Sequence, residues 1–479
     1  MRLRHHAISR IAIGLVCTLA APAIGAAPPS PPELVPGGRL GPPGVPQLVR
    51  WVEDWSAPPA KDASILERIR HIPLGGENTY LSIGGEARYY YQNSAHTALG
   101  TRADDGDFLV LERIRLIGDL HVGPDFRLYT ELGEDREYGE EFPTPSNRDG
   151  VDVRQAFIDG RVRLDQVGSL TLRLGRFELP LGSGKLVSLR DGRNVRFYYN
   201  GARATYTLPG VLRIDGFDAK PLSVLPGPFD DESQAGQSFK GIHTTVSLEA
   251  LKLPLSFDAY VYRMDRDAVR MAGVVGDDRR NTYGVRLYGK TSGLDYDLEF
   301  ARQSGRFADS SIRAWAGLIE GGYTLQNIPL TPRVFVRANA FSGDDSASDR
   351  TLGTFIPPAP KATLLTGSDA SWFNLSNLVD LFPSVTLRPN SKTVLNLGVE
   401  FFWRQTVNDG LYGIVGNLLP FQQSNSRFIG TAYNVEGVWN LNKYLTFRAF
   451  WTYLAMSDGL RAAGGKNANF IAFMAVLRF

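Results

Sequence analysis

Cysteine is almost absent from this chain, which has one such residue, Cys17, among 479. That cysteine lies in a stretch with the layout of a secretory signal peptide. Three arginines precede an apolar segment, 11–21, and small residues follow up to Ala26. We expect cleavage after Ala26, with Ala27 as the alternative site. The mature chain then has no cysteine, which excludes disulfides, thiol catalysis and cysteine-based metal sites.

Histidine is also scarce, with six residues in the whole chain. The four beyond the predicted signal peptide fall on separate segments. No serine has the setting of a catalytic nucleophile, which needs a base within hydrogen-bond reach. We therefore expect no catalytic residues, no metal site and no cofactor, and a hydrolase is disfavoured. The four histidines are His71, His96, His121 and His243.

The chain lacks an excess of either charge. Its 52 basic and 50 acidic residues give a formal net charge of +2, and removing the three arginines of the signal leaves 2 − 3 = −1. A nucleic-acid-binding protein shows a basic excess, so we expect no nucleic-acid partner. The ratio of arginine to lysine is unusually high, with 42 Arg and only 10 Lys. Arginine binds carboxylates in two parallel hydrogen bonds, which lysine cannot do.

Beyond the signal, no apolar run is long enough for a membrane-spanning helix, which takes about 20 residues. From residue 79 onward, apolar and polar residues alternate instead, as in Ile114 and Leu116 against Arg115. Alternation is the pattern of a half-buried strand. In a transmembrane barrel the apolar face meets lipid and the polar face lines the lumen. A hydrophobic content of 43% therefore remains compatible with a membrane protein.

Eighteen segments show this alternation, and tight joins between them alternate with long ones. Outer-membrane barrels have short periplasmic turns and long external loops, and an even strand number leaves both chain ends in the periplasm. We predict an all-β fold, a transmembrane antiparallel β-barrel of about 18 strands. The alternative is 16, if 382–388, the weakest segment, is not a strand. The predicted strands are 79–93, 108–123, 125–137, 151–165, 169–180, 195–208, 211–221, 238–248, 254–265, 279–291, 294–306, 312–326, 331–342, 382–388, 393–406, 427–440, 443–456 and 467–479. The long joins are 94–107, 138–150, 181–194, 222–237, 266–278, 343–381, 407–426 and 457–466.

The predicted organisation is a signal peptide at 1–26, a periplasmic N-terminal extension at 27–75 and the barrel at 76–479. The extension begins with a Pro- and Gly-rich part, typical of an extended segment, and its pattern becomes partly helical between 49 and 71. Two interpretations of the extension stay open. It caps or plugs a pore, or it is a tether with no role in transport.

The last predicted strand places alternate apolar residues, from Ile471 to the aromatic Phe479, on one face. This arrangement resembles the signal that the barrel-assembly machinery reads, so that machinery and the lipids of the outer membrane are expected partners. Aromatic residues on other predicted outward faces fit the girdles that such barrels place at membrane interfaces. They are Tyr89, Tyr91, Trp403, Trp439, Trp451 and Tyr453.

Several stretches, taken in order, carry a family resemblance. They are LIGDLHVGPDFR at 116–127, VRQAFID at 153–159, LGRFEL at 174–179 running into 182–188 and 194–196, and 402–405 with 409–413. Together they resemble the bacterial alginate-export family of outer-membrane porins. The resemblance implies a monomeric barrel of eighteen strands with a narrow, arginine-lined lumen that passes anionic polysaccharide. It also implies periplasmic polysaccharide-synthesis proteins as partners.

Alternation predicts which charged side chains line the lumen, and these form the candidate substrate-binding set. A guanidinium holds the carboxylate of a uronate in two parallel bonds, and many weak sites let a chain enter and leave. In the alternative interpretation, arginine–carboxylate networks only stiffen the wall. The candidate pore-lining residues are Arg88, Arg113, Arg115, Asp119, Arg127, Glu131, Asp159, Arg161, Arg173, Arg176, Arg203, Arg286, Arg337, Glu400, Arg404 and Arg448.

Residues of two loops and one histidine are also candidates for positions in or near the pore. The residues flanking 181–194, among them Arg190 and Arg196, are expected to fold into it. The aromatic segment 372–375 in the longest loop either folds inward as a gate or packs on the barrel rim. His121 is expected to be a lumen hydrogen-bonding residue beside Asp119.

Three functions are weighed against each other. The first is an outer-membrane channel that exports an alginate-like anionic exopolysaccharide. The second is an uptake porin for small anions such as uronates or aromatic acids, which would use the same arginines. The third is a barrel hydrolase or an adhesin, which the histidine count and the arginine lumen disfavour. Composition and pattern predict the charge of the solute, and they leave its identity, the direction of flow and the gate open.

Overall fold

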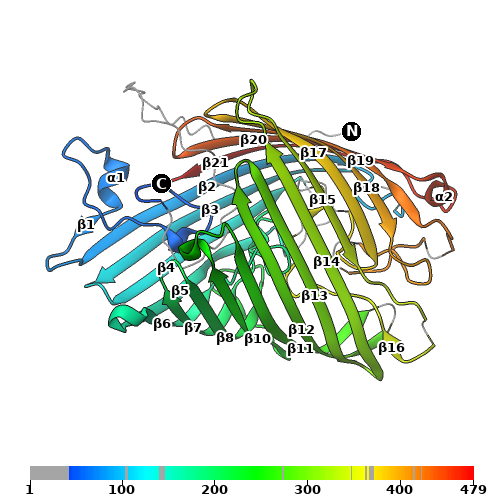
Figure 1. Cartoon of the computed structure of the whole chain (residues 1–479), viewed down its shortest axis with the longest axis horizontal. Helices are drawn as coiled ribbons and strands as arrows, with labels where there is room; N and C mark the ends of the chain where they lie inside the picture. The colour runs from blue at the N-terminus through cyan, green and yellow to red at the C-terminus, as the bar shows by residue number, and fades with distance from the viewer. Residues whose placement is uncertain are drawn as a thin grey trace, which may run out of the picture.

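Eighteen long antiparallel strands form a closed barrel (Figure 1). The computed structural model describes residues 42–102, 106–139, 146–271, 274–346, 348–361, 364–365, 370, 372–413, 416–421 and 423–479. The predicted signal peptide and residues 27–41 of the extension lie outside the described residues. The barrel strands are β2 (Tyr80–Ala95), β3 (Asp107–Val122), β4 (Phe126–Tyr138), β5 (Asp149–Arg163), β6 (Ser169–Phe177), β7 (Tyr199–Leu208), β8 (Leu212–Ser223), β10 (Gln237–Ser247), β11 (Ser256–Met271), β12 (Val274–Thr291), β13 (Leu294–Phe307), β14 (Ser310–Thr324), β15 (Arg333–Phe341), β17 (Leu378–Asn390), β18 (Thr393–Arg404), β19 (Phe428–Asn440), β20 (Leu445–Met456) and β21 (Ala468–Arg478).

The first and last long strands close the barrel. β2 pairs with β21 from Glu86 opposite Arg478 to Ala95 opposite Asn469, so no edge of the sheet is left unpaired. Figure 1 shows α1 and the C-terminus at the same end of the barrel, with α2 at the other end. The remaining elements are short: η1 (Arg50–Val52), α1 (Ile65–Ile69), β1 (Ile72–Pro73), η2 (Asp165–Val167), β9 (Glu232–Ser233), η3 (Glu249–Leu251), β16 (Thr351–Leu352) and α2 (Asp458–Arg461).

The strand number confirms the prediction of eighteen over the alternative of sixteen. The weakest predicted segment, 382–388, is the middle of β17, a strand of 13 residues. Its sequence signal is weak because Pro383 and Pro389 interrupt it, and proline cannot donate to the ladder. β17 pairs with β18 from Leu378 opposite Arg404, and the pairing lapses at Phe382 and Pro383 before it resumes in the same register with Ser384 opposite Gly398.

One predicted loop is wrong. The segment 266–278 was expected to be an external loop, yet β11 runs to Met271 and β12 begins at Val274. The polar residues that suggested a loop are paired across these two strands instead, as in Arg266 opposite Asp278. Cross-strand ion pairs stabilise a hairpin whose side chains meet water, so a polar composition does not require a loop there.

The two faces of the barrel differ as the alternation predicts. Outward residues are large, apolar and exposed in the isolated chain, among them Leu116, Phe473 and Trp439. Inward residues are polar or charged, and most are buried, because loops and neighbouring side chains fill the space inside the wall. No helix in the described residues is long and apolar enough to cross a membrane.

Candidate functional site

Most candidate pore-lining arginines lie on the inner wall and contact a carboxylate on a nearby strand. Arg127 of β4 holds Asp119 of β3 in two bonds of 2.7 and 2.8 Å. Arg173 of β6 holds Asp159 of β5 in the same way, with both bonds at 2.8 Å. The further pairs are Arg115–Asp135 at 2.9 Å, Arg203–Asp215 at 2.9 Å, Arg286–Asp297 at 2.8 Å, Arg337–Glu400 at 2.8 Å and Arg448–Glu436 at 2.6 Å.

These pairs fall into two groups on different parts of the wall. One group, on β3 to β8, contains Asp119 and the glutamate Glu131, which approaches Arg115 at 3.4 Å and accepts a bond from Gln155. The other group, on β12 to β20, contains Arg286, Arg337, Glu400 and Arg448. Most of these side chains are buried, and a buried pair keeps its geometry because removing one partner leaves a charge without compensation. The wall therefore carries charge in a fixed, rigid arrangement.

Arg161 and Arg176 differ from the buried pairs because water reaches them. Arg161 lies at the periplasmic end of β5, is exposed, and forms no ion pair with any of the described residues. Arg176 contacts Asp152 at 3.2 Å and the main-chain oxygen of Asp231 at 3.0 Å, and its side chain is partly exposed. Both guanidinium groups are therefore accessible to water.

Arg88 and Arg113 bind a loop as well as the wall. The segment 178–198, between β6 and β7, folds inward, and both guanidinium groups contact it at Asp191 and Arg193. Asn194 of the same loop accepts from Arg88 and donates to main-chain oxygens on β3 and β4 and to that of Asn147 in the loop between β4 and β5. Arg404 likewise donates to main-chain oxygens of the loop 405–427 rather than to a carboxylate.

The loop 178–198 crosses the lumen. Its C-terminal part is held by β2 and β3, whereas its N-terminal part reaches β13 on the far side of the barrel. There Lys185 contacts Asp297 at 2.8 Å and Ser183 donates to Glu299 at 3.0 Å. A second loop, 342–377, meets it where Ser188 donates to the main-chain oxygen of Pro360 at 2.9 Å. The structure therefore places the residues flanking 181–194 inside the pore, as expected from the sequence.

Buried acids of this loop have strongly shifted pKa values. Burial raises the pKa of Glu178 to about 7, although Arg196 contacts it at 2.9 Å, and one carboxylate oxygen of Glu178 has no hydrogen-bond partner among the residues that the structure describes. The pKa of Asp191 shifts in the opposite direction, although desolvation of its carboxylate acts to raise it. Arg196 and Arg113 lie close to it and hold its pKa well below the usual range.

Lys361 and Arg190 are among the cations of the inward loops that form no ion pair with a carboxylate of the described residues, and alternation could not identify them because they are not on strands. Desolvation lowers the pKa of Lys361, and the nearby cations Lys185 and Arg337 lower it further, although the carboxylate of Glu320 acts in the opposite direction. Arg190 stacks on Phe197 at 4.1 Å and donates to the main-chain oxygen of Val195. Burial and the like charge of Arg193 lower the pKa of Arg190 to about 10.

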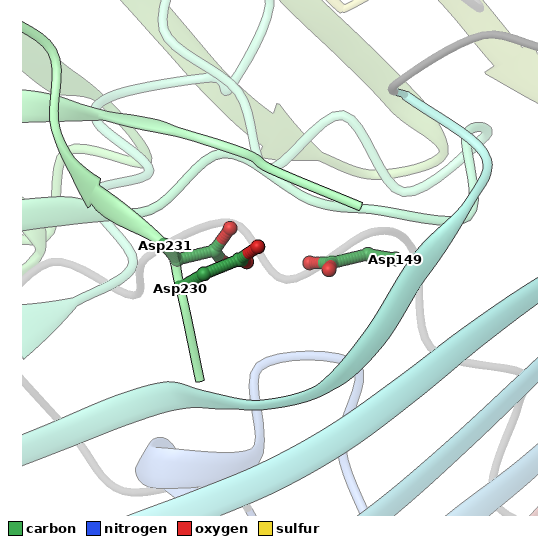
Figure 2. A group of neighbouring side chains, drawn as sticks. All are labelled: Asp149, Asp230 and Asp231. Carbon is green, nitrogen blue, oxygen red and sulfur yellow. The ribbon is translucent and has the colours of Figure 1, made fainter. Parts of the chain in front are cut away.

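A cluster of acids lies where β5 meets the loop after β8. Figure 2 shows the carboxylates of Asp149, Asp230 and Asp231 facing one another, and they are close enough to hold a metal ion. The guanidinium of Arg154 already contacts Asp149 and Asp231, and it also contacts Asp135 at 2.8 Å. The guanidinium of Arg154 therefore already compensates the negative charge of the cluster, as a bound metal ion would.

The structure also shows where two further features of the sequence lie, the segment 372–375 and His121. The segment 372–375 folds inward, because Trp372 and Phe373 are buried and Phe373 packs on the inward-facing Phe402 of β18 at 5.4 Å. His121 lies in the lumen, 3.2 Å from Asp119, and stacks on Tyr80 at 4.5 Å.

Comparison with known proteins agrees with this architecture. A family model described as alginate export matches residues 79–473. The fold is similar to that of the outer membrane protein OprD from Pseudomonas aeruginosa, with a TM-score of 0.56 and 11% identity over 83% of this chain and 93% of that one. OccK9 (OpdG) from the same organism gives a TM-score of 0.56 and 12% identity over 83% and 98% of the two chains. At these identities the likeness concerns the fold alone. No curated protein sequence matches the chain.

Proposed function

Because the chain belongs to the alginate-export family of outer-membrane β-barrels, we propose that its channel carries an anionic exopolysaccharide of the alginate type out of the cell. Two loop cations that form no ion pair with a carboxylate in the described part of the chain, Lys361 and Arg190, carry this proposal. A cation held among like charges gains free energy when an anion approaches. Both residues belong to loops that fold into the lumen, where a passing solute would meet them.

The wall arginines have a supporting role in this proposal. We propose the sixteen candidate residues named above as the lining of the path, with the partly exposed ones, Arg127, Arg161, Arg176 and Arg448, closest to the solute. Where a wall arginine has a carboxylate partner, as Arg127, Arg176 and Arg448 do, the site is weak, because a solute carboxylate must share the guanidinium with that partner. Weak, repeated sites allow a chain to move on.

Small-anion uptake is the second candidate, and a specific observation favours it. The loop 178–198 spans the lumen from β3 to β13, which leaves less width for a polymer than an open barrel of this strand number would. A uronate or an aromatic acid would need less space and would find the same cations.

The partners follow from the proposed channel. We propose that one chain forms the channel, that the last strand is presented to the barrel-assembly machinery, and that periplasmic polysaccharide-synthesis proteins deliver the polymer. The outer face of large apolar residues supports contact with bilayer lipid.

Block of single-channel current by oligogalacturonates tests the proposal. The purified chain in a planar bilayer is titrated with galacturonate, with tetragalacturonate and with the neutral control maltotetraose. A polysaccharide channel is blocked at lower concentration by the tetramer than by the monomer, because a longer chain spans several sites. Equal block by the two uronates favours small-anion uptake, and equal block by maltotetraose contradicts both candidates.

A further inference from the structure

The residues just before the barrel fold back into it. From Gln47 to Trp55 the side chains are largely buried, and Trp51 belongs to the same apolar cluster as the inward-facing Tyr129 and Phe157. We propose that this segment, 47–55, is an internal ligand that occupies the arginines at the periplasmic end of the lumen and narrows that mouth. A solute in the lumen would compete with the segment for these arginines. The inference rests on the proposed function only for the identity of that solute.

A single carboxylate organises the segment. Glu53 is buried and accepts hydrogen bonds from the main-chain nitrogen of Gln47 at 2.8 Å, from Arg50 at 2.5 Å and from the indole of Trp55 at 2.9 Å. The guanidinium of Arg70, which follows α1, also contacts Glu53. Two buried guanidinium groups thus depend on one acid, and losing that acid would leave both without a carboxylate.

The segment is joined to the seam that closes the barrel. Arg50 donates to the main-chain oxygens of Gly85 and Phe479, both at 2.7 Å, which lie on β2 and just beyond β21. Arg70 lies against Gly84, where an added Cβ would be 1.8 Å from its Nη1 atom. Gly84 thus leaves room for the guanidinium of Arg70 in the position from which it contacts Glu53 of the segment.

The segment also contacts the candidate lining. The ring of Trp51 lies 4.3 Å from the guanidinium carbon of Arg173 and 5.7 Å from that of Arg203. Arg127 donates to the main-chain oxygen of Trp51 at 2.9 Å, and Arg196 donates to that of Leu48 at 3.2 Å. A neutral ring face and two carbonyl oxygens therefore stand where a uronate would place its sugar ring and carboxylates.

The nature of these contacts allows an anionic solute to displace the segment from the arginines. A neutral carbonyl offers arginine neither the opposite charge nor the two parallel hydrogen bonds that a carboxylate offers. A polyanion entering the periplasmic mouth can therefore compete for Arg127, Arg173 and Arg196 while the segment moves aside. The contacts of 47–55 reach β2, β4, β6 and β7, which form one side of the wall, so the segment narrows the mouth from that side.

Conductance in potassium chloride alone tests this inference separately from the identity of the solute. Glu53→Ala removes the organising carboxylate, and Trp51→Ala removes the stacking ring without adding a buried charge. We expect each variant to raise the single-channel conductance, about twofold for Glu53→Ala. Glu249→Ala and Trp439→Ala are matched controls, since Glu249 lies in an exposed turn and Trp439 on the outer face.

Limited trypsin digestion provides a second readout on the same folded samples, whose folding is checked by heat-modifiable gel mobility. The bond after Arg50 is buried in the wild type and should resist trypsin, whereas Glu53→Ala should be cut there. Trp51→Ala keeps the inference testable if Glu53→Ala does not fold. Wild-type conductance and wild-type protection in the folded variants would overturn the inference, whatever tetragalacturonate does to the current.

Discussion

Asp119 and Arg127 face each other on neighbouring strands at the periplasmic end of the lumen, joined by two bonds of 2.7 and 2.8 Å. The same guanidinium donates to the main-chain oxygen of Trp51 in the folded-back segment. One arginine thus connects the wall, the segment and the path of a solute. Its charge is compensated by Asp119, so the balance of the two side chains determines the local potential.

Neutralising Arg127 should reduce anion preference. Arg127→Gln removes the guanidinium that holds Asp119 and leaves His121 as its one ion-pair partner among the described residues, so the less compensated carboxylate makes the lumen more attractive to cations. We expect the anion-over-cation permeability ratio to fall, as measured by the reversal potential in a potassium chloride gradient. The double variant Asp119→Asn with Arg127→Gln has the net charge of the wild type and should recover most of the preference. An unchanged ratio in the single variant would show that this pair does not face the ion path.

Removing Glu400 should destabilise the barrel. Glu400 is fully buried on β18 and holds Arg337 of β15 at 2.8 Å, so Glu400→Ala leaves a buried guanidinium short of a partner. The loss is expected to be about 3–5 kcal/mol. Heat-modifiable gel mobility should show the variant unfolding at a lower temperature than the wild type. Glu249→Ala, in an exposed turn, serves as the control and should match the wild type.

Stability should decrease as pH rises through neutrality because of Glu178. Burial raises the pKa of this carboxyl to about 7 from its ordinary value of 4.5, so the folded chain retains a proton that the unfolded chain releases. The resulting stabilisation is complete below the unfolded pKa and is lost as pH rises through the folded one. The unfolding temperature should therefore fall by a few degrees between pH 6 and pH 8.

Glu178→Gln provides the control for the pH effect. Glutamine has no proton to lose, so the variant's unfolding temperature should vary less over the same pH range than that of the wild type. A wild-type profile that is flat, or that rises with pH, would show that Arg196 keeps Glu178 ionised in the folded protein.

The strands of the wall and the faces of their residues could be predicted from the sequence, whereas most of what fills the lumen could not. The period of two depends on each residue and its immediate neighbours, so it identified eighteen strands and placed Arg115 on the inner face and Leu116 on the outer face. The strands β11 and β12 extend through the predicted loop 266–278 because cross-strand ion pairs support polar residues there. Local composition does not reveal such pairs.

The contents of the lumen depend on contacts between segments far apart in the chain. Asn194 is held by Arg88, which is 106 residues away, and Arg50 reaches the main chain of Phe479, 429 residues away. No periodic pattern marks Lys361, Arg190 or Trp51 as lumen residues, since none of them lies on a strand. The candidate site could thus be predicted for its wall arginines and, through the loop expected to fold inward, for Arg190, whereas nothing in the sequence indicated Lys361.

The reversal potential of the channel across a potassium chloride gradient tests the central claim most directly. The account predicts that the wild type prefers anions, and that Lys361→Ala combined with Arg190→Ala lowers the permeability ratio about twofold or more while the folded barrel remains intact. The control Lys392→Ala removes a lysine from the exposed β17–β18 turn and should leave the ratio unchanged. A wild-type channel that prefers cations, or a double variant with an unaltered ratio, would contradict the account.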